Sequence, residues 1–210
     1  MNVLFQKMLA HWRLVLSLLA AGFVAAVLLM TGGAAALAWT NTEEFCIGCH
    51  EMKNNVYAEF KGTIHDQNRT GVRAVCVDCH QPREMGPSIL RKLQASKDVY
   101  SHFISQSIST PEKFQARRHE LATQVWRRMK DTDSLECRNC HNPAKMSAAL
   151  QSAKAQTRHA KAAADSLTCI DCHFGIAHKE PEGPGPREML IAGAKKTPVN
   201  PALTLKGPTP

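Results

Sequence analysis

The sequence predicts a mostly α-helical protein in which one N-terminal transmembrane helix precedes a small domain built from two similar halves. Three observations support this fold class. A long stretch near the N-terminus carries no charge, the later segments show helical rather than strand periodicity, and one short cysteine–histidine motif occurs four times in two pairs. We therefore divide the chain into residues 1–13, 14–38, 39–180 and 181–210.

The first element is an apolar run that contains no charged residue from Leu14 to Thr42. About 20 apolar residues span a bilayer, so a transmembrane anchor at residues 14–38 fits. Basic residues precede the run and acidic residues follow it, which places the N-terminus in the cytoplasm and the later residues outside. A cleaved signal peptide is the alternative, because Ala36-Leu37-Ala38 resembles a cleavage site, but such apolar regions normally have about 7–15 residues. We expect an uncleaved anchor in a bacterial inner membrane and a periplasmic domain.

All eight cysteines lie in four Cys-x-x-Cys-His motifs. The motif residues are Cys46, Cys49 and His50; Cys76, Cys79 and His80; Cys137, Cys140 and His141; and Cys169, Cys172 and His173. In a c-type haem site the two thiols add to the porphyrin vinyl groups, and the next imidazole reaches the iron. Zinc sites and redox disulfides also use Cys-x-x-Cys, but they place no such demand on the following residue. The sequence predicts four covalently bound c-type haems, on whose apolar faces short helices pack.

The motif spacing predicts two di-haem halves. The first cysteines of the first two motifs are 30 residues apart, those of the last two are 32 apart, and 61 residues separate the second from the third. An extra histidine lies between the motifs of each half, at His65 and at His159. In the linking segment, Thr110 as N-cap and Pro111 at the first helical position predict the start of a helix. Seven prolines and four glycines predict that residues 181–210 form an extended or disordered tail.

The formal net charge of +8 is weak evidence for an acidic partner. Each haem would bring two propionates, or about −2 when both are ionised. Four haems would therefore offset most of the positive charge of the chain. We do not expect a nucleic acid partner.

Six histidines lie outside the motifs, and four of them are candidates for the second axial ligand of an iron. His11 precedes the membrane span, and His119 lies among charged residues where a solvated side chain is expected. The remaining candidates are His65, His102, His159 and His178. At the first motif, Met52 follows the motif histidine by two residues, and its thioether can either bind the iron or pack against the ring.

Together these features resemble the NapC/NirT family of membrane-anchored tetrahaem quinol dehydrogenases. The resemblance rests on the single span, the paired motifs, Cys-x-x-Cys-His-x-Met at the first motif, STPEKF in the linker, ECRNCH at the third motif and TCIDCHFGIAH at the fourth. It implies a mostly α fold wrapped on haems. It also implies that the protein oxidises quinol at the membrane surface and passes electrons to a periplasmic reductase, for which nitrate reductase is our first expectation.

The resemblance further implies a quinol site formed by Asp98 with Lys92 nearby. Positions 92 and 98 lie about 240° apart around an ideal helix, so the two side chains share a pocket only if the helix is irregular or is approached at its edge. Arg91 and Lys97 are substitutes for Lys92. Met52, rather than His50, would bind the iron of the first haem.

The resemblance also implies the remaining axial ligands. His65 and His178 would be distal ligands that cross between the halves. His159 would be the remaining distal ligand, with His102 as the alternative. Two other function classes stay open: an anchored electron shuttle without its own quinol site, and a terminal reductase with an open iron. Assembly into a homo-oligomer is left open as well.

Overall fold

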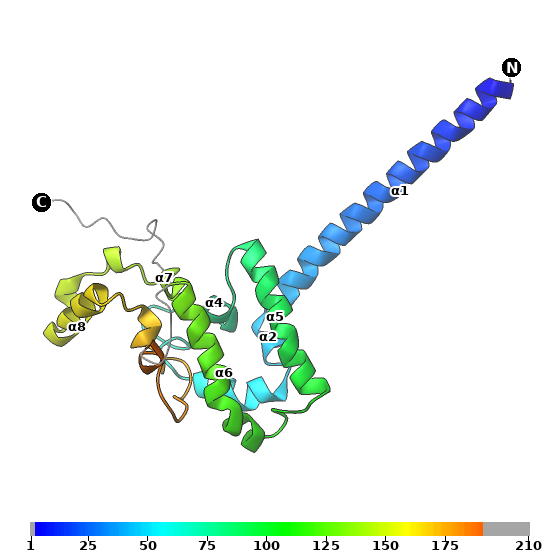
Figure 1. Cartoon of the computed structure of the whole chain (residues 1–210). Helices are drawn as coiled ribbons and strands as arrows, with labels where there is room; N and C mark the ends of the chain where they lie inside the picture. The colour runs from blue at the N-terminus through cyan, green and yellow to red at the C-terminus, as the bar shows by residue number, and fades with distance from the viewer. Residues whose placement is uncertain (1–2, 191–210) are drawn as a thin grey trace, which may run out of the picture. The chain divides into compact units, whose positions relative to one another are not determined.

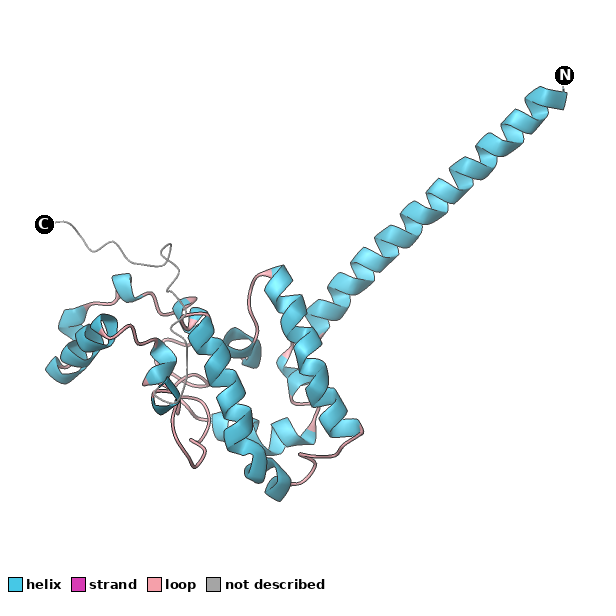
Figure 2. Ribbon diagram, viewed as in Figure 1, coloured by secondary structure: helices cyan, strands magenta, loops and turns pink. Residues whose placement is uncertain are grey.

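The computed structural model describes residues 3–190, which form helices and turns without a strand among them (Figure 2). The mostly α-helical class predicted from the sequence is confirmed. The chain separates into two units, Met1–Cys46 and Ile47–Pro210. We describe each unit by itself.

The first unit consists of helix α1 (Val3–Trp39) and the short helix α2 (Glu43–Cys46) (Figure 1). The part of α1 from His11 to Trp39 is long and apolar enough to cross a membrane. None of the residues in its most apolar stretch is buried against other parts of the protein. The predicted anchor at residues 14–38 lies within this stretch. The hydroxyl oxygen of Thr42 accepts a hydrogen bond from the backbone N–H of Phe45 at 3.2 Å, which caps the helix that carries the first motif cysteine.

Helices α5 (Met85–Phe103) and α6 (Pro111–Asp131) are the longest elements of the second unit (Figure 1). Helix α6 begins where the sequence predicts, because the Thr110 hydroxyl oxygen accepts a hydrogen bond from the backbone N–H of Lys113 at 3.3 Å and Pro111 follows. Its buried face carries Phe114, Trp126 and Met129. Helix α5 has no buried residue, although it carries several large apolar side chains.

The hydrophobic core of this unit is small. Within residues 3–190, the buried hydrophobic residues are Phe60, Ile108, Phe114, Trp126, Met129 and Ile170. Trp126, Met129 and Ile170 form one cluster, against which Cys79 and Phe174 pack. Protein side chains thus supply little apolar burial, which agrees with the expectation that bound haem completes the core.

The shorter elements carry the other three motifs. They are the π-helix η1 (Met52–Tyr57), α3 (Ala58–Phe60), α4 (Cys76–His80), α7 (Leu135–Arg138), the 3₁₀ turns η2 (Pro143–Lys145), η3 (Ala148–Leu150) and η4 (Cys169–Asp171), and helix α8 (Ala153–Ala164). The second and fourth motifs fold alike: the carboxylate of Asp78 accepts the N–H of Val75 at 2.8 Å, and that of Asp171 accepts the N–H of Thr168 at 2.9 Å. This shared cap supports the duplication inferred from the spacing.

Residues 181–190 pack against α6 and end in the 3₁₀ turn η5 (Glu188–Leu190). The Nε2 atom of His119 donates to the carbonyl oxygen of Pro184 at 2.9 Å, so this histidine is half-buried and bonded, not solvated as its charged neighbours predicted. The Nζ atom of Lys130 donates to the carbonyl oxygen of Pro186 at 2.7 Å. The rest of the predicted tail, residues 191–210, lies outside the described residues.

Candidate haem sites

Each motif histidine lies beside one of the four extra histidines. The pairs, with the distance between ring centroids, are His65–His141 (6.1 Å), His80–His178 (6.2 Å), His159–His173 (6.1 Å) and His50–His102 (5.5 Å).

Three of these distances fit an iron atom placed between two imidazole rings. A metal–imidazole bond is about 2.0 Å long, and the bonded nitrogen lies about 1.1 Å from the ring centroid, so two rings on opposite sides of one metal are roughly 6 Å apart. None of the eight cysteines, all of which lie in the described part of the chain, forms a disulfide. The residues therefore fit haem at the second, third and fourth motifs.

Two of the three pairs cross between the halves. His65 belongs to the first half and lies beside His141 of the third motif, whereas His178 follows the fourth motif and lies beside His80 of the second. The third pair joins His159 to His173 within the second half. Of the two alternatives that the sequence left open, it is thus His159, and not His102, that lies at the fourth motif.

Hydrogen bonds at Nδ1 leave the other nitrogen of two extra histidines available. The Nδ1 atom of His178 lies 3.0 Å from the carbonyl oxygen of Val56, and that of His159 lies 2.7 Å from the side-chain oxygen of Gln151. Both partners are acceptors, so both Nδ1 atoms carry the proton and Nε2 keeps its lone pair. The Nδ1 atom of His65 is buried without a hydrogen-bond partner.

Burial keeps the His80 and His178 rings neutral. It lowers the pKa of His80 to about 3, with a smaller contribution from the nearby His178, and it also lowers the pKa of His178. A neutral imidazole is the form that binds a metal.

A buried ion pair holds the segment after His178 against the first half. Arg118 donates from Nη1 to Glu59 Oε1 at 2.7 Å, from Nη2 to Glu59 Oε2, and from Nη2 to the carbonyl oxygen of Lys179 at 2.7 Å. The backbone N–H of Lys179 donates back to Glu59 at 3.0 Å. Burial raises the pKa of Glu59, but the hydrogen bonds from Arg118 and Lys179 outweigh it and hold that pKa below its usual value. No local sequence signal marks this pair, because 59 residues separate its members.

The first motif differs from the other three because a carboxylate stands between its two imidazoles. Glu51 is only 2% exposed; the Nδ1 atom of His102 lies 2.7 Å from its Oε1, and the Nε2 atom of His50 lies 3.3 Å from the same oxygen. Burial raises the pKa of Glu51, but the hydrogen bond with His102 outweighs it, so the pKa is lowered. Met52 is the next residue and begins the π-helix η1, a type of helix that is frequent at functional sites. Glu51 was not predicted as a site residue, although it directly follows the first motif histidine in the sequence.

Ser134 joins the third and fourth motifs. Its side chain is fully buried, and its hydroxyl oxygen accepts hydrogen bonds from the Thr168 hydroxyl at 2.7 Å and from the Ile170 N–H at 3.1 Å. Its φ of 52° lies in the left-handed region, which is rare for a residue with a side chain. The thiols of Cys137 and Cys169 also interact, and this hydrogen bond raises the pKa of Cys137. The third and fourth attachment sites are therefore neighbours.

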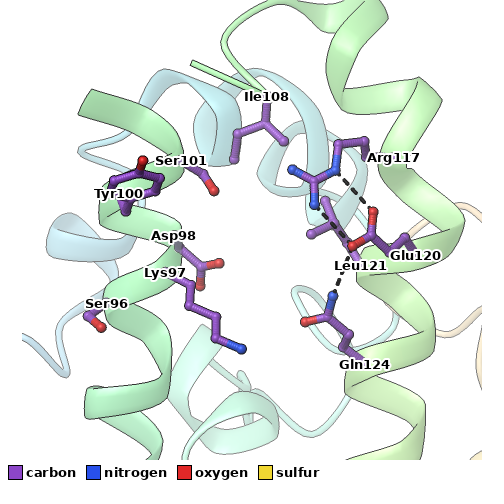
Figure 3. Close-up of a pocket in the computed structure, with 10 residues that line it drawn as sticks. All are labelled: Ser96, Lys97, Asp98, Tyr100, Ser101, Ile108, Arg117, Glu120, Leu121 and Gln124. Carbon is purple, nitrogen blue, oxygen red and sulfur yellow. Dashed lines mark hydrogen bonds and ion pairs between the residues drawn. The ribbon is translucent and has the colours of Figure 1, made fainter. Parts of the chain in front are cut away.

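A cavity of about 440 Å³ lies between α5 and α6 (Figure 3). Its lining residues are Ser96, Lys97, Asp98, Tyr100, Ser101, Ile108, Arg117, Glu120, Leu121 and Gln124. Asp98 and Lys97 extend from α5 towards the cavity, whereas Lys92 is not among its lining residues, because α5 is a continuous α-helix that turns positions 92 and 98 apart.

Asp98 combines solvent contact with partial desolvation. Its side chain is exposed to the cavity, yet the surrounding protein atoms raise its pKa by burial, against the opposing effect of Arg91 and Lys97. A carboxylate with a raised pKa holds a proton more readily than an ordinary surface aspartate. The cavity therefore contains a candidate proton acceptor beside a cation.

The family model described as "NapC/NirT cytochrome c family, N-terminal region" matches residues 8–183. The chain is 51% identical over 166 residues to the denitrification system component NirT of Stutzerimonas stutzeri, and 49% identical over 166 residues to the cytochrome c-type protein NapC of Escherichia coli strain K12. Both alignments cover 79% of this chain and 82% of the relative. A protein of Allochromatium vinosum named as a tetraheme cytochrome-c type is 46% identical over 170 residues, which cover 80% of this chain and 91% of that one. No solved structure matches the chain.

The sequence, the structure and the relatives agree with one another. The chain has four Cys-x-x-Cys-His motifs, imidazole pairs whose spacing fits an iron atom, and an N-terminal helix long enough for a membrane anchor. The chain belongs to the NapC/NirT cytochrome c family and is a haem-binding c-type cytochrome of electron transport.

Proposed function

We propose that this protein oxidises quinol from the membrane pool and delivers the electrons to a periplasmic reductase, with nitrate reductase as the first candidate. The proposal places the N-terminus in the cytoplasm, residues 14–38 in the inner membrane and the second unit in the periplasm. Support comes from the similarity to NapC of Escherichia coli and NirT of Stutzerimonas stutzeri, and from the apolar helix α1. The observation that carries it is the α5–α6 cavity, where Asp98 with its raised pKa lies beside Lys97.

Covalently bound haem would supply the one-electron redox chemistry that joins a two-electron donor to its acceptor. The eight motif cysteines would hold four such groups. The axial ligands that this chain would provide are Met52 for the first motif, His80 with His178 for the second, His141 with His65 for the third, and His173 with His159 for the fourth. At the first motif, the contacts of Glu51 with His50 and His102 favour Met52, because they occupy both imidazoles with a carboxylate.

The cavity residues would bind the quinol and take its protons. Quinol loses two protons and two electrons when it becomes quinone. Asp98 would accept a proton from a quinol hydroxyl, since its raised pKa brings it closer to the working pH than an ordinary aspartate. The Lys97 ammonium, which lines the same cavity, would stabilise the oxygen as it loses that proton. Lys97, one of the two substitutes named for Lys92, would then take the role that the family resemblance implied for Lys92.

The test is reduction of the purified protein by a quinol analogue in stopped-flow absorbance measurements. We expect Asp98→Asn to slow haem reduction by roughly 100-fold, the lower end of the contribution of a general base. The control Asp165→Asn removes an exposed carboxylate on another helix and should leave the rate unchanged. Dithionite should reduce both variants fully, which shows that their electron carriers are intact.

The pH dependence has a defined sign. Quinol oxidation should rise with pH as Asp98 ionises, with a midpoint above the usual aspartate pKa of about 3.9, and Asp98→Asn should remove this rise. Lys97→Met should slow the reaction more than Lys92→Met. Absence of reduction of the wild-type protein by any quinol would reject the proposal in favour of an anchored electron shuttle fed by another protein.

The choice of reductase needs a separate measurement, because the identities to the NirT and NapC relatives are nearly equal. Quinol-reduced protein should be reoxidised rapidly by a periplasmic nitrate reductase in the presence of nitrate. Faster reoxidation by a nitrite reductase would replace nitrate reductase as the partner and leave the quinol site untouched.

A further inference from the structure

Two arginines of the second unit carry buried N–H groups that have no hydrogen-bond partner. They are Arg91 on α5, at Nε, and Arg128 on α6, at Nε and Nη2. More than about 90% of buried polar groups in native proteins are hydrogen-bonded. An unsatisfied buried donor is costly, and more so when it belongs to a charged group. Two such cations on neighbouring helices form a candidate anion site.

Within residues 3–190, no carboxylate accepts a hydrogen bond from these three N–H groups. Burial, and after it the positive charge of Arg91, lowers the pKa of Arg128, so the two guanidinium groups repel each other. Glu136 and Asp98 act in the opposite direction on Arg128 through their charge. However, one oxygen of Glu136 is itself buried without a partner, and the other accepts a hydrogen bond from Thr132 at 3.4 Å.

Both helices that carry these arginines contact the second motif. Cys79 of that motif packs against the cluster that contains Trp126 and Met129 of α6, the helix that carries Arg128. Gln81, which directly follows His80, donates from Nε2 to the carbonyl oxygen of Ser88 at 2.8 Å and to its hydroxyl at 2.6 Å, and Ser88 lies one turn before Arg91 on α5. The unsatisfied donors therefore lie on the two helices that contact the second motif.

We propose that Arg91 and Arg128 bind the two propionate groups of the haem attached at Cys76 and Cys79. This inference rests on the haem ligation proposed above and extends it to residues outside the motifs. A haem carries two carboxylates on one edge, which matches two cations presented by two helices. Guanidinium groups bind carboxylates through charge-assisted hydrogen bonds, often two at a time. Part of the positive charge of the chain thus has a defined purpose: it neutralises haem carboxylates inside the fold.

Helices α5 and α6 would then both line this haem site. Bound propionates would satisfy the buried donors and remove the repulsion between the arginines. The positive charges would in turn favour the reduced, less positively charged iron and raise the potential of this one haem.

The test uses the full-length, haem-loaded protein in detergent and the variants Arg91→Gln, Arg128→Gln and the double variant. Resonance Raman spectra report the propionate-bending band, which responds to hydrogen bonds on the carboxylates. A redox titration with a chemical mediator reports the reduction waves. We expect the band of one haem in four to shift and one wave to move to lower potential, with the largest effect in the double variant. Arg127→Gln is the matched control, because it removes an exposed arginine from the adjacent position of α6 and should change neither readout.

Neither readout involves quinol, so failure of the quinol proposal leaves this test intact. An unchanged propionate band in the double variant would overturn the inference. So would a Glu136→Gln variant that reproduces every effect of Arg128→Gln, because Glu136 would then be the partner of this arginine. If the glutamine variants do not accumulate, Arg128→Lys keeps the charge but offers fewer donors. It should shift the band while nearly preserving the potential, and a spectrum identical to that of Arg127→Gln would contradict the proposal.

Discussion

Replacing Arg118 with methionine should destabilise the fold by about 3–5 kcal/mol, the cost of removing one partner of a buried ion pair. The side chains of Arg118 and Glu59 are only 10% and 12% exposed. Arg118 also donates a hydrogen bond to the carbonyl oxygen of Lys179, the residue that follows His178 in the chain. Methionine fills much of the same volume, so the loss measures a buried carboxylate that keeps only the hydrogen bond from the Lys179 N–H, and not a cavity.

The adjacent arginine provides a matched control. Arg117 pairs with Glu120 on the same helix, but these side chains are 34% and 55% exposed. Exposed pairs contribute about 0.2–1 kcal/mol, so Arg117→Met should cost roughly 1 kcal/mol or less. Two substitutions of the same kind, one residue apart, should therefore differ by about 2–4 kcal/mol, chiefly because one ion pair is buried and the other is exposed.

The assay is guanidinium unfolding at neutral pH, followed by haem absorbance in detergent. Glu59 has a lowered pKa in the folded protein, so its contribution is present above the unfolded glutamate pKa of about 4.3 and is lost as the pH falls through the folded value. The difference between wild type and Arg118→Met should therefore shrink in acid. Equal losses for the two arginine variants, or a difference independent of pH, would refute this reasoning.

Two further predictions concern contacts at the haem motifs. His178→Ala and His159→Ala should each give one more high-spin iron per molecule than the wild type in electron paramagnetic resonance, and the double variant should give two more, because their rings lie beside His80 and His173 respectively; only one additional high-spin iron in the double variant would contradict separate haems. Ser134→Ala should cost about 1–3 kcal/mol through its two lost hydrogen bonds. The free energy of unfolding of Ser134→Gly should exceed that of Ser134→Ala by about 1 kcal/mol, since glycine adopts a positive φ without steric cost. A lower melting temperature for Ser134→Gly than for Ser134→Ala would argue against backbone strain at this position.

The cap at Thr110, the apolar run of α1 and the four motifs were readable in the sequence because each depends on residues close together in the chain. A hydroxyl three residues before the N–H that it caps, or two thiols and an imidazole within five positions, constrains local geometry regardless of the rest of the fold. The motif spacing also predicted the duplication, which the matching caps of Asp78 and Asp171 support in the structure.

The pairing of each extra histidine with a motif histidine could not be predicted from such local patterns. The sequence offered His65, His102, His159 and His178 as ligand candidates, but it could not choose between His159 and His102. In the structure, His159 lies beside His173 of the fourth motif, whereas His102 contacts the buried Glu51 at the first. The helix angle already raised doubt about Lys92, and in the structure Lys97 lines the same cavity as Asp98, whereas Lys92 is not among the lining residues.

The sequence by itself therefore determined the local features of this protein: an apolar helix of membrane length and four Cys-x-x-Cys-His motifs. The tertiary structure decided how those sites are completed. His178 meets the carbonyl oxygen of Val56 across 122 residues, and Arg118 meets Glu59 across 59. Such contacts depend on loop closure and on the mutual burial of polar groups, and neither quantity is written in the pattern of neighbouring residues. The unpaired donors of Arg91 and Arg128 likewise depend on how α5 and α6 pack, so the sequence alone does not reveal them.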